Sequence, residues 1–160
     1  MPNRTEPSDF IIIIDTREQQ PYTFPCDSVR HKLYAGDYSV LGHETEVAVE
    51  RKSLADFQST VAHAQARFQV ELDKLLKFKA AAVVIEADLT QLLLNRYKTR
   101  LSPKSILGWS TWIQIVYGVP VIWAGSRQGA VAWTEEFLRG YVRWAQARAR
   151  VAANTQGDET

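Results

Sequence analysis

The chain has 160 residues, of which 46% are hydrophobic and 23% charged, and its formal net charge at pH 7 is +1. These values are ordinary for one soluble globular domain with a sizeable core. No apolar run approaches the about 20 residues that span a bilayer, so we exclude a membrane-spanning protein. The near-neutral charge means that any basic residues contacting nucleic acid must be clustered locally.

The cysteine content and the N-terminal residues indicate the cellular compartment. Cys26 is the single cysteine, which excludes an internal disulfide, and with three scattered histidines it also excludes a Cys/His zinc site. Residues 1–9 are polar, predict a loose tail and show no signal-peptide pattern. We therefore expect an intracellular, cytoplasmic protein, and the compact size favours a bacterial or viral source.

The first predicted strand is Phe10–Ile14, whose β-branched residues are typical of a buried central strand. Asp15 follows at its carboxyl end, where site residues of α/β sheets often lie. We prefer Asp15 as an acid of a functional site over the alternative, an ordinary turn residue. Arg17 and Glu18 are expected to form an ion pair that supports this site.

A β-hairpin is predicted further along the chain. A loop, a short edge strand or turn, and two further strands follow in this order: Gln19–Asp27, Ser28–Ala35, Tyr38–Leu41 and Val47–Ser53. Gly42–Thr45 supplies the turn between the two strands. The hairpin therefore brings Asp37 near Glu50.

Three polar side chains of this hairpin suit metal-assisted chemistry. Glu50 and Lys52 are two residues apart on a strand and so share one face, close to Asp37. Two carboxylates can hold Mg²⁺, which activates a bound water, and a neighbouring lysine can orient that water or stabilise developing negative charge. The alternative is a surface strand with a solvated ion pair of little energetic weight.

The remaining chain predicts alternating helices and strands. Helices are expected over Leu54–Val61, about Ala64–Phe78, Asp88–Tyr97, Ile106–Tyr117 and from Arg127 or Thr134 to Val151, with strands at Ala80–Glu86 and Val119–Trp123. Ala80–Glu86 is apolar on both faces, which favours a strand parallel to its neighbours. Its last residue, Glu86, either lies on the far side of the site or caps the next helix.

Several charged residues of the helices have two interpretations. Asp56 lies three residues after Ser53, so it completes a capping box or contributes an acid to the site. Arg67 and Glu71 lie on one helical face and either turn toward the site or form a solvated row.

The densest basic stretch contains Arg96, Lys98, Arg100 and Lys104, with one tyrosine among them. Exposed arginine and lysine suit contact with DNA phosphates, and the alternative is a solvated connector. A second basic face is expected on the last helix, at Arg139, Arg143, Arg148 and Arg150. All five tryptophans lie in the second half of the chain, which exceeds the need of one core and suggests that some cover a subunit interface.

Four linked motifs together resemble the nuclease domain of the XPF-type structure-specific endonucleases. They are Asp15-Thr16-Arg17-Glu18, Gly36-Asp37-Tyr38, Glu50-Arg51-Lys52-Ser53 with Asp56, and Arg67-Phe68. Their order and spacing match over roughly residues 10–145. The resemblance implies an α/β fold of the restriction-endonuclease type, PD-(D/E)XK, with a mixed central sheet flanked by helices. It also implies a nuclease domain over residues 10–152, between the tail 1–9 and a polar tail 153–160.

The resemblance implies an Mg²⁺-dependent endonuclease, with Mn²⁺ as a substitute, that cuts branched DNA in repair or recombination. The resemblance also implies a role for each motif residue. The metal is expected on Asp37, Glu50, the carbonyl of Arg51 and, directly or through water, Asp15, and Lys52 is expected to act on the attacking water. Supporting roles are expected for Glu18, Asp56 and Glu71, and contacts that hold the site or the phosphate for Arg17, Arg51 and Arg67.

The chain departs from the family pattern at two positions. Ala66 and Glu71 stand where relatives often have glycine and glutamine, so the role of Glu71 stays open. No tandem helix-hairpin-helix module is present in the sequence, so selectivity is expected from a partner, a homodimer formed through the last helices, or the basic loop. Two alternatives remain: a non-catalytic DNA-binding or dimerisation subunit, and a nuclease of the same core with another target.

Overall fold

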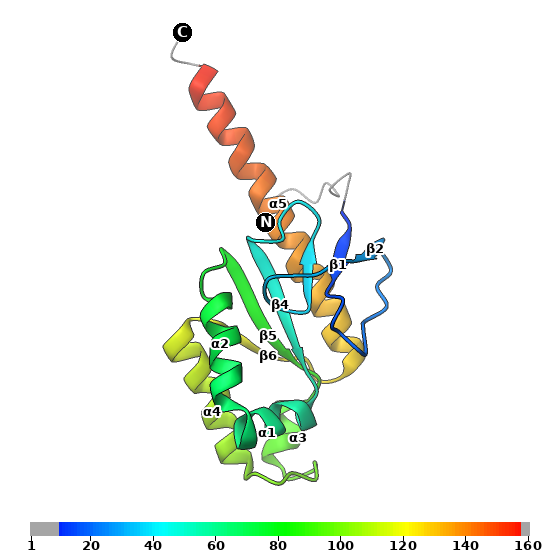
Figure 1. Ribbon diagram of the computed structural model, residues 1–160, viewed down its shortest axis with the longest axis vertical. Helices are drawn as coiled ribbons and strands as arrows, with labels where there is room; N and C mark the ends of the chain where they lie inside the picture. The colour runs from blue at the N-terminus through cyan, green and yellow to red at the C-terminus, as the bar shows by residue number, and fades with distance from the viewer. Residues whose placement is uncertain (1–9, 158–160) are drawn as a thin grey trace.

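The computed structural model of the chain describes residues 10–157, which form a mixed sheet between two layers of helices (Figure 1). The strands are β1 (Ile12–Ile14), β2 (Ser28–Arg30), β3 (Tyr38–Val40), β4 (Val47–Lys52), β5 (Ala80–Ile85) and β6 (Val121–Trp123), and the helices are α1 (Leu54–His63), α2 (Gln65–Leu75), α3 (Leu89–Leu93), α4 (Pro103–Tyr117) and α5 (Arg127–Gly157). The predicted α/β fold class is confirmed. None of the helices in this part of the chain is long and apolar enough to cross a membrane.

The six strands lie in the order β2-β1-β3-β4-β5-β6. β3 pairs antiparallel with β1 and with β4, whereas β5 is parallel to both of its neighbours. The predicted hairpin and the predicted parallel orientation of β5 are thus confirmed. The helices α1 and α2 connect β4 to β5 and allow the two strands to run parallel. The carboxyl ends of β4 and β5 therefore lie at the same end of the sheet.

Each face of the sheet has its own hydrophobic core. Ala48, Val83 and Ile85 face α1, α2 and α4, whereas Val47, Val49 and Val84 pack with residues of α5. The two-residue period of β4 therefore places Glu50 and Lys52 on the α1/α2 side and Arg51 on the α5 side. Figure 1 shows α5 running behind the strands, with α2 on the other side and α1, α3 and α4 below and to the left.

Local signals set most helix ends. Ser53 and Asp56 form a reciprocal capping box at the start of α1, and Ser102 caps α4 ahead of Pro103. α4 ends at Tyr117 and is followed by Gly118, which has φ 64°. The capping box at Ser53 and Asp56 agrees with the interpretation of the sequence.

Three predicted helix ends differ from the structure by three or more residues. α3 ends at Leu93 and not at Tyr97, because the chain leaves the helix through Asn95, which has φ 54°. α2 ends at Leu75, before Phe78. α5 continues past Val151 to Gly157, so the first part of the predicted polar tail is helical, and its end projects beyond the sheet (Figure 1). The predicted tail 1–9 and residues 158–160 lie outside the described residues.

Gly36 supports the site through its backbone. It has φ 74°, and an added Cβ would lie 3.1 Å from the carbonyl oxygen of Val49 and 3.1 Å from the Cβ of Ala48. A side chain at position 36 would push this residue, which directly precedes Asp37, away from β4.

We expect Gly36→Ala to destabilise the protein more than Gly42→Ala. Gly42 also has a positive φ, 84°, but an added Cβ would meet nothing within 4 Å. The left-handed conformation alone costs about 1–2 kcal/mol in each variant, and the crowding against β4 adds to this only at Gly36. Urea unfolding of both variants measures the difference, and equal losses of stability would contradict a tight contact at Gly36.

Candidate active site

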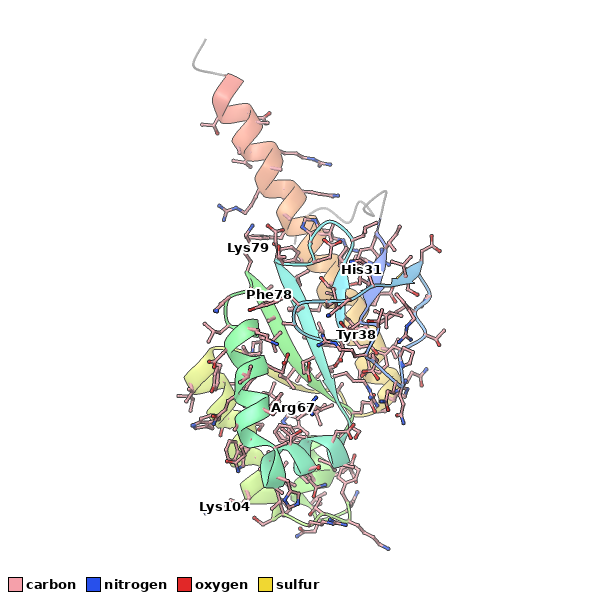
Figure 2. All side chains as sticks on the ribbon, in the orientation of Figure 1. His31, Tyr38, Arg67, Phe78, Lys79 and Lys104 are labelled. Atoms are coloured by element: carbon pink, nitrogen blue, oxygen red, sulfur yellow. The ribbon has the colours of Figure 1, made fainter. Side chains whose placement is uncertain are left out.

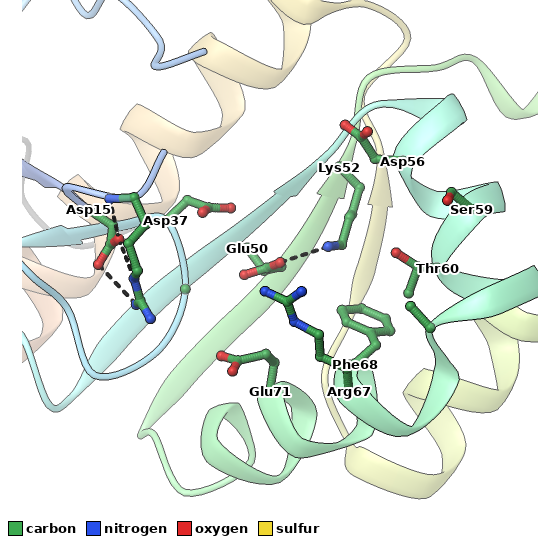
Figure 3. A pocket seen from close by; sticks show the side chains of 13 residues that line it. Asp15, Asp37, Glu50, Lys52, Asp56, Ser59, Thr60, Arg67, Phe68 and Glu71 are labelled. Atoms are coloured by element: carbon green, nitrogen blue, oxygen red, sulfur yellow. Dashed lines mark hydrogen bonds and ion pairs between the residues drawn. The ribbon is translucent and has the colours of Figure 1, made fainter. Parts of the chain in front are cut away.

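An open cleft of about 410 Å³ lies between the β1 end, the β3–β4 hairpin and the two helices α1 and α2 (Figure 3). It gathers many of the predicted site residues. These are Asp15, Arg17, Asp37, Glu50, Lys52, Asp56, Arg67 and Glu71. Residues that lie more than 50 positions apart in the sequence thus meet at one site.

Asp37 is held through its backbone and its carboxylate. Its N–H donates to the carbonyl of Val49 at 2.9 Å, and its own carbonyl accepts from the N–H of Asp15 at 2.8 Å. The N–H of Arg51 donates to Asp37 Oδ2 at 2.7 Å. The residue is therefore fixed between β1 and β4 before any ligand binds.

The charge of Asp37 is poorly compensated. Burial, and next the nearby carboxylate of Glu50, raise the pKa of Asp37 well above its usual range, although the N–H of Arg51 and the charge of Lys52 act in the opposite direction. Two carboxylates that share a partly buried cleft favour a cation between them. Aspartate and glutamate oxygens are the donors that Mg²⁺ prefers, so these residues fit that ion.

Lys52 is oriented by contacts on two sides. Its Nζ lies 3.0 Å from Glu50 Oε1 and 4.8 Å from the ring centre of Phe68 on α2. Figure 3 shows the ammonium group directed into the cleft beside Glu50. The predicted juxtaposition of Asp37, Glu50 and Lys52 is thus present.

Asp15 is only 1% exposed, and its carboxylate is already engaged. Oδ1 accepts from the N–H and Nε of Arg17, each at 2.8 Å, while Oδ2 accepts from the N–H of Leu33 at 2.7 Å. Burial disfavours its ionisation, but the hydrogen bonds from Arg17 and Leu33 outweigh burial and lower its pKa. The carboxylate holds the loop after β1 and has little capacity left for a metal.

One prediction about this region is wrong. The expected ion pair between Arg17 and Glu18 is absent from the described residues, because Arg17 binds Asp15 instead. Residues 10–157 contain no group of three or more His, Cys, Asp or Glu side chains that could hold a metal ion, so a role of Asp15 at the metal, directly or through water, stays a prediction.

Arg51 points to the other face of β4. Its side chain is 8% exposed and binds Glu86 through Nε at 2.6 Å, and its Nη1 lies 3.7 Å from Glu18 Oε1. Its guanidinium also lies 5.9 Å from the ring centre of Tyr22. The expected contact of this side chain with DNA is therefore corrected to a buried ion pair behind the site, while its carbonyl remains a predicted ligand.

Glu86 is a residue whose role the sequence left open. Asp88, and not Glu86, caps α3. Glu86 instead binds Arg51 and, at 3.0 Å, Arg127 at the start of α5. Its position just after β5 is visible in the sequence, but nothing local indicates an arginine partner 41 residues away.

The helical wall of the cleft carries residues of both charges. Arg67 is exposed on α2 and makes no ion pair or hydrogen bond through its side chain with the rest of residues 10–157, and its guanidinium points into the cleft (Figure 3). Asp56 lines the cleft and also closes the capping box, so both interpretations of this residue apply. Glu71 binds Lys74 at 2.9 Å at the rim, and Ser59 and Thr60 add hydroxyl groups that the sequence analysis did not single out.

The basic stretch lies away from this cleft. Arg96, Lys98 and Arg100 belong to the connection between α3 and α4, and Lys104 is in the first turn of α4. Figure 2 places Lys104 at the end of the molecule opposite the projecting end of α5. None of these residues lines the cleft itself.

Known proteins share this fold. The family profile of the ERCC4 domain matches residues 14–137. XPF from Aeropyrum pernix matches with a TM-score of 0.63 and 19% identity, over 92% of this chain and 73% of that chain. XPF from Aeropyrum pernix in complex with DNA matches with a TM-score of 0.62 and 19% identity, over 83% of this chain and 64% of that chain. No curated protein sequence matches the chain.

We expect Asp37→Asn to stabilise the protein at pH 8 when divalent metal is absent. The raised pKa means that folding favours the protonated carboxyl, so wild-type stability falls as pH rises from about 4 through the folded-state pKa. The amide keeps an acceptor for the Arg51 N–H and removes the repulsion from Glu50. A gain on the order of 1 kcal/mol at pH 8 should shrink toward pH 4 in urea titrations, and a pH-independent difference would argue against this charge effect.

Glu86→Gln should destabilise the protein by about 3 kcal/mol, because it leaves the buried guanidinium of Arg51 without its main partner. Glu136→Gln is the matched control: it also removes a glutamate charge from a pair with arginine, but Glu136 is 69% exposed. The control should lose less than about 1 kcal/mol. Chemical unfolding measures both, and similar losses would refute a supporting role of the buried pair.

Proposed function

The chain belongs to the ERCC4 domain family, and from this membership we propose that it is a metal-dependent endonuclease that hydrolyses phosphodiester bonds of DNA. The observation that carries the proposal is the cleft in which Asp37, Glu50 and Lys52 meet on one side of the hairpin. Branched duplexes such as forks, flaps and junctions are the proposed substrates. The DNA-bound structure of the similar XPF from Aeropyrum pernix supports DNA as the ligand.

Asp37 and Glu50 are the proposed side-chain ligands of Mg²⁺, with the carbonyl of Arg51 as a further ligand. Mg²⁺ usually binds to one or two carboxylates and keeps several waters, so Asp37 and Glu50 suit it. When bound, Mg²⁺ neutralises charge on the phosphate and lowers the pKa of a bound water. Mn²⁺ is the proposed substitute because it also favours oxygen ligands.

Lys52 is the residue proposed to orient the attacking water. Glu50 and the ring of Phe68 hold its ammonium group in the cleft, so its three N–H donors require little reorganisation. Arg67 is proposed to bind a non-bridging phosphate oxygen, since its guanidinium is directed into the cleft (Figure 3). A planar guanidinium suits bidentate binding of phosphate.

Asp15, Arg17, Asp56 and Glu71 are proposed to support the site. Asp15 and Arg17 fix the loop that carries them, and any contact of Asp15 with the metal would pass through water. Asp56 holds the start of α1, and Glu71 fixes Lys74 at the rim. Each of these contacts positions the residues that meet the phosphate.

A homodimer also remains a proposal. Ile115 is 82% exposed and Val116 54% exposed on α4, and Trp144 is 43% exposed on α5. The other four tryptophans are partly buried. These apolar side chains are compatible with the predicted subunit interface.

Cleavage of a labelled forked duplex with Mg²⁺ tests the proposed function. We expect the wild type to cut, and we expect Asp37→Asn and Lys52→Ala each to lower the rate about 10²-fold or more, since both act on the developing charge. Lys77→Ala is the matched control, because Lys77 is an exposed lysine outside the cleft.

The other outcomes separate the alternatives. Intact fork binding without cleavage by any of the four proteins would favour a non-catalytic subunit. Equal cutting of plain duplex and fork would refute the branched-DNA substrate. A melting temperature that rises with Mg²⁺ equally in the wild type and Asp37→Asn would contradict the proposed metal site.

A further inference from the structure

A second hollow lies on the other side of α1 from the cleft. It has a volume of about 280 Å³ and is formed by α1 together with Lys98, Arg100 and Leu101 of the connection before α4. Ser59 lines both the cleft and this hollow, so the two share a rim on α1. Ala55 and Ala62 are among the residues of α1 that line it, and their side chains are small.

The two cavities differ in charge. The cleft is lined by five acidic and three basic residues, as expected for a site that holds a cation. The described lining of the second hollow contains no acidic residue and includes Lys98, Arg100 and His63, with the amide of Gln58. Such a lining favours an anion, and a phosphate is the anion that a nucleic acid presents.

The basic connection is anchored against the fold. The N–H of Arg100 donates to Gln58 Oε1 on α1 at 2.9 Å, and the hydroxyl of Tyr97 accepts from the N–H of Asp88 at 3.0 Å. Within residues 10–157 the side chains of Lys98 and Arg100 make no ion pair or hydrogen bond with protein. The backbone is therefore positioned while both cationic groups remain available to a ligand.

We propose that this hollow binds a backbone phosphate of the DNA substrate away from the scissile phosphate, so that one strand crosses α1 at Ser59. The inference rests on the proposed function and extends it by a second phosphate subsite. The proposal gives the basic residues of the two cavities different roles. Lys98 and Arg100 bind this phosphate, whereas Arg67 binds in the cleft.

The test compares Lys98→Gln/Arg100→Gln with Arg148→Gln/Arg150→Gln, both in an Asp37→Asn background that is not expected to cut. The control pair also removes two positive charges, but it lies on the exposed end of α5, at the opposite end of the molecule (Figure 1). The magnitude of the slope of log affinity against log salt concentration for a forked duplex should fall by about 0.9 for the first pair, the value expected for one lost phosphate contact. The control slope should not change.

A second variant and a second measurement guard against indirect effects. Ala62→Glu places an acid in the hollow and should weaken fork binding in the same direction, without removing a charge elsewhere. Phosphate-ethylation interference should identify a phosphate away from the cut position whose ethylation weakens binding. This interference should disappear in Lys98→Gln/Arg100→Gln. An unchanged slope and interference pattern in that pair, or equal changes in the control pair, would overturn the proposal.

The outcomes distinguish this subsite from the proposed function. If the wild type cleaves and the Lys98 and Arg100 changes have no effect on binding, the subsite proposal is refuted and the proposed nuclease function is retained. If fork binding depends on these two residues but the wild type does not cleave, the subsite proposal is retained and the proposed nuclease function is refuted.

Discussion

The placement of Asp37 beside Glu50 is the constraint on which the rest of the site depends. Hydrogen bonds from β1 and β4 hold the backbone of Asp37, and a left-handed glycine before it allows the close approach. Burial is the main cost of ionising Asp37, and repulsion from the carboxylate of Glu50 adds to it. Lys52 offsets part of this charge, and the remainder makes the cleft receptive to a cation.

β4 separates the reaction site from its support because its side chains alternate. Glu50 and Lys52 face the cleft, while Arg51 turns into the opposite core. There, the guanidinium of Arg51 lies between Glu86 and Glu18, and Glu86 also binds Arg127. One short motif therefore supplies both the chemical groups and the ion pair that fixes their strand.

The sequence was sufficient for features that depend on neighbouring residues. The hairpin, the shared face of Glu50 and Lys52, and the capping box at Ser53 follow from periods and spacings of two or three residues. The partners of Asp15 and Arg51 were not predictable in this way, because Leu33 and Glu86 reach them only after distant strands have aligned. The last turns of α5 were also not predicted, because this polar end of the helix has no buried face and therefore no helical period of apolar residues.

The buried ion pair also constrains how the sequence can vary. Arg51 and Glu86 are 35 residues apart, and each neutralises the other in a place that water scarcely reaches. A change at either position alone leaves a stranded charge, so the two positions must change together or not at all. Arg67 makes no ion pair within residues 10–157, so its replacement would leave no buried charge without a partner. In this fold, the residues least able to vary independently include some that never meet the substrate.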